Sequence, residues 1–245
     1  TKQLVAELRQ TILSHPLAGS PLFLRVLLEE LRQCGRYETL TEQLDAYLST
    51  ETIGELYQRV LKRLEADTSA ENVRKVMTAL WASRAGLSEE ELLCFTGLSQ
   101  LQWAPIDLAL EQALGRNENR LLIDHDYLRK GVEDRYLRTK EEVRKAHGRL
   151  ADWFDAQEEW TARKAAEWPW QLRTYGNWEK IASILTTFGC FNAILKHAGA
   201  IELASLLLHF EPSERIRIAR ELTSDLFNSN LTNEEQHKGG VSVLD

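Results

Sequence analysis

The segment 124–126 (Asp-His-Asp) places an imidazole between two carboxylates, which makes it the strongest candidate in the sequence for a binding role. It follows a short apolar run, 121–123, that suits a buried strand. It precedes an amphipathic stretch that predicts a helix to Leu137. Asp126 is predicted to cap that helix. The ring of His125 then either satisfies a buried strand end or faces whatever lies beside the domain.

Motifs of other chemistries are missing from the sequence. It contains neither GxxxxGK[ST] nor GxGxxG, so it has no loop that could cradle a triphosphate by itself. It also lacks His-Glu-x-x-His, a Cys-x-x-Cys pair and a serine elbow. The carboxylate pairs Glu42 with Asp45 and Glu133 with Asp134 are better explained as solvated helix faces. We therefore predict no catalytic residue, no metal site and no enzymatic activity of this chain alone.

Composition limits the class of protein. The chain has 245 residues and a net charge of -7, with 43% hydrophobic and 27% charged residues. These values are typical of a soluble globular protein and argue against nucleic-acid or anionic-membrane partners. Cys34, Cys94 and Cys190 are odd in number and far apart, which indicates free thiols in a reducing compartment, here the cytoplasm. No apolar run approaches the ~20 residues of a membrane span. Thr1 already lies in a helical pattern, which suggests a piece of a longer protein.

The periodicity of apolar residues predicts an all-α chain of several domains. We expect a small helical bundle at 1–68, a winged-helix domain with a small β-wing at 69–138, an α-hairpin array of TPR-like, superhelical type at 139–228, and a flexible tail at 229–245.

Local signals place the elements of the first two domains. Pro21 suits the first position of a helix, where its missing N–H costs nothing. Ser88 and Glu91 have the spacing of a capping box, and Gly97 is predicted to end the helix that they begin. Pro105 is predicted to start the third helix of the winged domain, which would reach residue 114.

That third helix bears on the DNA-binding hypothesis that a winged helix invites. Residues 103–114 contain two acidic residues and no basic one. Such a helix repels phosphate, so a DNA-binding function is only a remote alternative. Five tryptophans are expected to fill the core between helical hairpins: Trp153, Trp160, Trp168, Trp170 and Trp178.

Four stretches together resemble a known family. They are 19–31 (GSPLFLRVLLEEL), 80–92 (LWASRAGLSEEEL), 125–129 (HDYLR) and 132–137 (VEDRYL). They look like STAND-class NTPases, the group of NACHT and apoptosome-type ATPases, and most like the nephrocystin-like and telomerase-associated NACHT proteins with C-terminal TPR or WD repeats. The resemblance covers about residues 1–185.

The resemblance implies a regulatory role after a P-loop ATPase domain that this chain lacks. Pro21 would close over the nucleotide base, and His125 would contact the β-phosphate of ADP, so ADP or ATP would be a shared cofactor. Asp124 occupies the methionine position of the family motif, which departs from the pattern. The chain would hold the ATPase domain in an ADP-bound resting state and relay activation.

The implied partners are the adjacent P-loop ATPase domain, C-terminal TPR or WD repeats, and other copies in a homo-oligomer formed on activation. From the residues alone, Pro21 could simply start a helix and His125 could simply satisfy a strand end. The competing hypothesis is therefore a helical protein–protein interaction scaffold with no nucleotide role.

Overall fold

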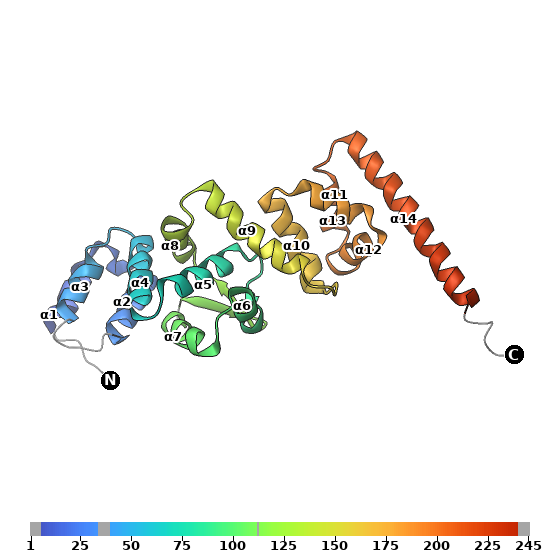
Figure 1. Cartoon of the computed structure of the whole chain (residues 1–245). Coiled ribbons are helices and arrows are strands. Elements are labelled where there is room, and N and C mark those ends of the chain that lie inside the picture. Colours follow the sequence, from blue (N-terminus) through green and yellow to red (C-terminus); the bar gives the residue numbers. More distant parts are fainter. Residues whose placement is uncertain (1–5, 34–39, 112, 240–245) are drawn as a thin grey trace. The chain divides into compact units, whose positions relative to one another are not determined.

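The computed structural model describes residues 6–33, 40–111 and 113–239. The chain divides into two compact units, Thr1–Val143 and Arg144–Asp245, each with its own set of internal contacts. Within the described residues, fourteen α-helices and three short strands make the chain predominantly helical, as the sequence predicts (Figure 1). No helix among these residues is both long and apolar enough to cross a membrane.

The first unit begins with four helices and one 3₁₀ turn. They are α1 (Ala6–Ser14), η1 (Pro16–Gly19), α2 (Pro21–Gln33), α3 (Leu40–Leu48) and α4 (Ile53–Asp67). Pro21 is the first residue of α2, as predicted, and the Phe23 N–H donates to the hydroxyl of Ser20 at 3.4 Å. Thr52 caps α4 in the same way through the N–H of Glu55.

Helices and three strands alternate in the rest of this unit. The order is α5 (Ala70–Ala82), β1 (Leu87–Ser88), α6 (Glu89–Thr96), α7 (Gln100–Leu110), β2 (Leu114–Asn117), β3 (Arg120–Ile123) and α8 (Asp126–Tyr136). The antiparallel sheet has the strand order β1-β3-β2, with Leu87 opposite Leu121 and Leu114 opposite Ile123.

The β2–β3 hairpin closes through two residues, Glu118 and Asn119, both with positive φ. That geometry matches the right-handed twist of paired strands. The predicted strand at 121–123 is therefore confirmed. Strand β2 begins at Leu114, and the turn is confined to the two residues Glu118 and Asn119.

The capping signals of α6 are confirmed. Ser88 and Glu91 form the predicted capping box, and Gly97 ends α6 in the left-handed region. The expected start of the third helix at Pro105 is wrong, because Pro105 lies inside α7. The helix begins earlier, where the N–H of Ser99 donates to the side chain of Gln102 at 2.9 Å.

The crossing of α4 and α8 is the most extensive helix pair of the first unit. Two glycines, Gly54 and Gly131, allow the backbones to approach. A Cβ at position 131 would lie 3.2 Å from Cβ of Tyr57 and 3.4 Å from the carbonyl oxygen of Gly54. Tyr57 on α4 and Leu128 on α8 are both fully buried.

The second unit is built from helices alone in its described residues. Their bounds are α9 (Lys140–Asp155, which begins just before the unit boundary), α10 (Ala162–Tyr175), α11 (Trp178–Thr186), α12 (Phe188–His197), α13 (Ala200–Leu207) and α14 (Pro212–Gly239). Gly148 on α9 makes room for Tyr175 on α10, since a Cβ there would lie 3.0 Å from the ring. Pro169 lies within α10.

The predicted domain limits remain predictions. Residues 240–245 of the expected flexible tail 229–245 lie outside the described residues, and α14 extends through the rest of it to Gly239. Cys34 also lies outside the described residues.

Candidate functional site

His125 is half-buried and immediately precedes α8. Its carbonyl oxygen accepts from the N–H of Arg129 at 3.0 Å, so the backbone begins the helix as expected. Asp126 was predicted to cap α8, but it is the first residue inside the helix, and the cap position has no side-chain hydrogen bond. The reason is the register of the helix, which starts one residue earlier than a capping role of Asp126 requires.

Pro21 is exposed at the start of α2. Helices α2 and α8 both pack against α4. Among the described residues, no hydrogen bond, ion pair or ring contact joins Pro21 to His125. The nucleotide roles inferred for these two residues stay predictions that no observation tests.

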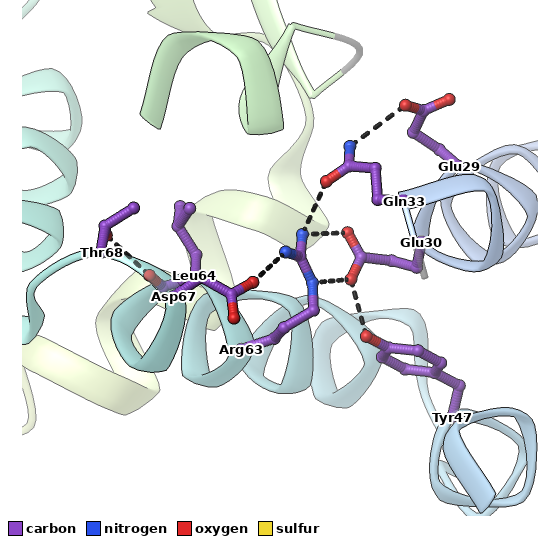
Figure 2. Close-up of polar contacts among 8 residues, drawn as sticks. All are labelled: Glu29, Glu30, Gln33, Tyr47, Arg63, Leu64, Asp67 and Thr68. Carbon is purple, nitrogen blue, oxygen red and sulfur yellow. Dashed lines mark hydrogen bonds and ion pairs between the residues drawn. The ribbon is translucent and has the colours of Figure 1, made fainter. Parts of the chain in front are cut away.

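The polar cluster of the first unit joins α2, α3 and α4 (Figure 2). The guanidinium of Arg63 donates to both oxygens of Glu30, at 2.6 and 2.9 Å. It also donates to Asp67 at 2.7 Å and to Gln33 at 3.0 Å. Tyr47 donates its hydroxyl to Glu30 at 2.7 Å, and burial raises the pKa of Tyr47 above its ordinary value, with the charge of Glu30 acting in the same direction.

This cluster is saturated with partners inside the protein. Each oxygen of Glu30 accepts from Arg63, and the cation is divided among three acceptors. A charge pair that is satisfied internally fixes helices relative to one another and offers little to a ligand. We therefore assign it a structural role.

A narrow cavity lies between α2, α4 and the C-terminal end of α7 with the residues that follow it. Its lining includes Arg25, Glu29, Tyr57 and Ala109. The cavity volume is about 20 Å³, enough for roughly one water molecule and far too small for a nucleotide. The hydroxyl of Tyr57 is buried here without a hydrogen-bond partner among the described residues, and burial raises the pKa of Tyr57 to about 12.

A second ion pair fixes α4 against α8. Arg135 donates through Nε to Glu65 at 2.7 Å, and the hydroxyl of Tyr136 donates to the same carboxylate. The hydrogen bond from Arg135 lowers the pKa of Glu65, whereas burial raises that of Tyr136. Like the Glu30 cluster, this ion pair holds two helices together, so its charges are explained by helix packing.

In the second unit, Lys164 is buried between two indole rings. Its Nζ lies 4.7 Å from the ring centroid of Trp168 and 5.2 Å from that of Trp160. It donates to the carbonyl oxygens of Asp155 and Gln157, which closes the C-terminal end of α9. Burial lowers the pKa of Lys164. Lys164 thus caps a helix, and its ammonium is held against the faces of two tryptophans. Of the five tryptophans expected in the core, Trp168 is buried, whereas Trp153, Trp160, Trp170 and Trp178 are partly exposed.

A chain of buried polar side chains also links α9 to α10. Nδ1 of His147 lies 2.8 Å from Oε1 of Gln171, and Nε2 of Gln171 donates to Glu167 at 2.9 Å. Arg163 closes the chain with an ion pair to Glu167 at 2.6 Å. Such a chain fixes the register of the hairpin, because a shifted helix would leave buried groups without partners.

Metal binding has no candidate in the part of the chain that the structure describes, where no group of three or more His, Cys, Asp or Glu side chains could hold an ion. The chemically reactive side chains of the described residues are thus mostly engaged in packing.

Several helices carry large apolar side chains on their solvent faces, including Ile216 and Phe227 on α14, and the most exposed pairs lie on α7 and α13. On α7, Leu101 is 88% exposed and Leu108 is 68% exposed. On α13 and its C-terminal cap, Ile201 is 88% exposed and Leu208 is 67% exposed. Both pairs are seven residues apart, which places each pair on one side of its helix. The exposure of these residues was not predicted from the sequence, although α7 carries apolar residues on more than one side.

Comparisons with known proteins give distant relatives. A TPR repeat-containing protein of Dictyostelium discoideum is 26% identical over 181 residues, covering 71% of this chain and 11% of that protein. Tetratricopeptide repeat protein 41 of Rattus norvegicus is 26% identical over 211 residues, and its counterpart from Mus musculus is 24% identical over 209. These matches cover 69% and 68% of this chain and 16% of each relative. The chain thus spans between a tenth and a sixth of their lengths.

No family model matches the chain, and no solved structure matches it significantly.

The relatives correct the family expected from sequence. They are named for TPR repeats, so the resemblance to STAND-class and NACHT NTPases, and the regulatory function drawn from it, are wrong. The stretches that suggested the resemblance have local explanations. The Gly-Ser-Pro motif begins α2, and the Leu-Ser-Glu-Glu-Glu motif is the capping box of α6. Such signals recur wherever helices begin.

Proposed function

We propose that this chain is a helical protein–protein interaction scaffold with no nucleotide role and no enzymatic activity. The observation that carries the proposal is the pair of outward apolar rows on α7 and α13, one in each compact unit. Large apolar side chains exposed in register on a helix are typical of a surface that another protein covers. The relatives named for TPR repeats support the same function, since their names denote helical repeat proteins.

The proposal includes an assignment of domains. Residues 69–138 are assigned to a winged-helix domain, and the order α5, β1, α6, α7, β2 and β3 supports this assignment. Residues 139–228 supply the TPR-like array. Because α7 contains no basic residue, the winged domain would serve protein packing and not DNA binding.

We also propose a cytoplasmic location. Cys94 and Cys190 are free thiols, which supports a reducing compartment.

The test uses the full-length protein purified from its own cells with an affinity tag. We expect partner proteins to co-purify in fixed stoichiometry with the wild type and to be depleted by Ile201→Glu with Leu208→Glu. The matched control is Leu13→Glu, which changes an exposed leucine of α1. Identical partners in wild type and the double variant would contradict the role of α13.

Nucleotide binding is tested separately by calorimetric titration of ADP into the chain 1–245 and into the full-length protein. We expect no binding heat from the chain, and His125→Ala to leave the full-length titration unchanged. Binding by the chain that disappears in the His125→Ala variant would contradict a scaffold without a nucleotide role.

A further inference from the structure

Helix α7 is apolar on two opposite faces. Its inner face buries Trp103, Ile106 and Leu110. Its outer face exposes Leu101, Ala104, Pro105 and Leu108. The outer positions follow the spacing i, i+3, i+4, i+7, so they form one continuous row on the helix surface. The core is already filled by the inner row, and the outer row contributes nothing to it.

We propose that this outer row is a docking site for an amphipathic helix of a partner protein, with leucine-type side chains flanked by Lys or Arg. The inference rests on the proposed scaffold function and names the partner class for one of its surfaces. The spacing of the row, the charges around it and the rigidity of α7 each support it.

The spacing of the row favours a helical partner. From Leu101 to Leu108 it spans about 10 Å along the axis. The two large side chains stand at its ends, and Ala104 and Pro105, with short or flat side chains, lie between them. A partner helix can approach closely at the middle and place its own apolar residues between the two leucines, as ridges fit into grooves.

The charges around the row favour a basic partner. Helix α7 and its C-terminal cap carry Asp107 and Glu111 and no Lys or Arg. At the other end, Gln100 donates to Glu89 at 2.8 Å and holds that carboxylate beside the first turn. Arg116 on β2 pairs with Asp107 at 2.6 Å, so these two charges cancel. The excess negative charge around the row comes from Glu111 and Glu89. The C-terminal end of a helix also has a negative potential, which adds to that of Glu111.

The backbone offers one more acceptor within the row. Pro105 has no N–H to donate, so the carbonyl of Leu101, four residues earlier, lacks its usual α-helical donor. A Lys or Arg side chain of the partner can supply that donor. This acceptor and the acidic rim point to the same chemistry.

The row is held in place before any partner arrives. The ion pair between Arg116 on β2 and Asp107 joins the hairpin to α7, and the buried Trp103 and Ile106 fix the opposite face. A rigid face loses little conformational entropy on binding.

The test uses the chain 1–245 and three fluorescent, helix-stapled peptides as probes. The first has a leucine row flanked by Lys and Arg, the second has the same row flanked by Glu, and the third has the basic flanks with serines in place of the leucines. We expect anisotropy to show saturable binding of the first alone. We expect Leu101→Gln with Leu108→Gln to weaken it about tenfold or more, since buried leucines at the centre of a small interface dominate its affinity. Leu13→Gln is the matched control and should change nothing.

Each other outcome overturns the inference in a distinct way. Equal binding by the double variant would place the probe elsewhere on the chain. Equal binding of the Glu-flanked peptide would refute the basic partner, and failure of all three peptides would refute helix docking. Self-association of the chain that the double variant abolishes, measured by sedimentation, would assign the row to a second copy. If the α13 double variant loses its partner proteins and none of the three peptides binds the chain, the scaffold proposal remains. Only the proposed docking site on α7 is then refuted.

Discussion

Glu30 on α2 and Arg63 on α4 are 33 positions apart and form a two-pronged ion pair, with Nε and Nη2 of the guanidinium at 2.6 and 2.9 Å from the two carboxylate oxygens. The side chain of Glu30 is 3% exposed and that of Arg63 is 21% exposed. Because water cannot replace a lost partner of Glu30, the pair commits α2 and α4 to one relative position (Figure 2).

Arg63→Ala should lower the free energy of unfolding of the chain by about 3–5 kcal/mol, because it leaves the buried Glu30 without its cation. Arg63→Lys should lose less, since a lysine keeps the charge but not the two-pronged geometry. Urea unfolding followed by circular dichroism measures both. The control is Arg32→Ala, which breaks an exposed pair with Glu29 and should change little. Equal effects of Arg63→Ala and Arg32→Ala would refute the importance of burial.

Tyr57→Phe should leave the stability at pH 7 unchanged or raise it by about 1 kcal/mol. The hydroxyl of Tyr57 is buried without a partner among the described residues, so its removal relieves a desolvation cost. Tyr47→Phe is the contrasting variant and should destabilise the protein, because the hydroxyl of Tyr47 donates to Glu30. Thermal unfolding of the two variants and of the wild type measures both changes in stability.

The same tyrosine predicts a pH dependence. Burial raises the pKa of Tyr57 from 10.0 in the unfolded chain to about 12 in the folded one, so the folded state holds its proton longer. The contribution of Tyr57 to the free energy of unfolding is constant below pH ~10. It decreases as the pH rises toward about 12, by roughly 1.4 kcal/mol per pH unit. Tyr57→Phe should make the alkaline loss shallower. The rest of the alkaline loss of stability would come from Tyr47 and Tyr136, whose pKa values are also raised in the folded chain. Identical alkaline slopes for wild type and variant would contradict this.

Cys94 should react with iodoacetamide faster than Cys190. Cys94 is exposed on α6, whereas burial raises the pKa of Cys190 and reduces the fraction of reactive thiolate at pH 8. Peptide mass spectrometry after timed alkylation separates the two sites. In urea the two rates should converge, and faster labelling of Cys190 in the folded chain would be incompatible with its half-buried position.

Elements fixed by neighbours in sequence could be predicted. The capping box of Ser88 with Glu91 and the left-handed stop at Gly97 each depend on residues at most four positions away. The prediction from Pro105 was wrong because the helix starts earlier, after Ser99, and the proline lies inside it at the cost of one backbone hydrogen bond.

Features that depend on contacts across the fold could not be predicted. Glu30 and Arg63 look like ordinary surface charges until α2 and α4 pack together. The outer row of α7 could not be predicted either. In the sequence Leu101 and Leu108 look like core residues, and only the fold shows that they are exposed. The family predicted from the four stretches was wrong because helix starts share the same residues across unrelated families.

Gly86→Ala should strongly destabilise the first unit. Gly86 has a φ of 77°, in the left-handed region, and an added Cβ would lie 2.4 Å from the carbonyl oxygen of Leu121 on β3. That oxygen belongs to the backbone of the central strand and cannot move aside without disturbing the sheet. Backbone strain of this kind costs about 1–3 kcal/mol, and the clash adds to it.

Gly97→Ala separates the backbone strain from the steric clash. Gly97 has a similar φ of 70°, but nothing lies within 4 Å of an added Cβ. We expect Gly97→Ala to show the strain alone and Gly86→Ala to lose more stability in urea unfolding. Hydrogen exchange of β3 should also be faster in the Gly86→Ala variant, since relief of the clash requires β1 and β3 to separate. Equal losses for the two variants, with unchanged exchange in β3, would show that the turn before β1 adapts without the strand and would refute the close packing at Leu121.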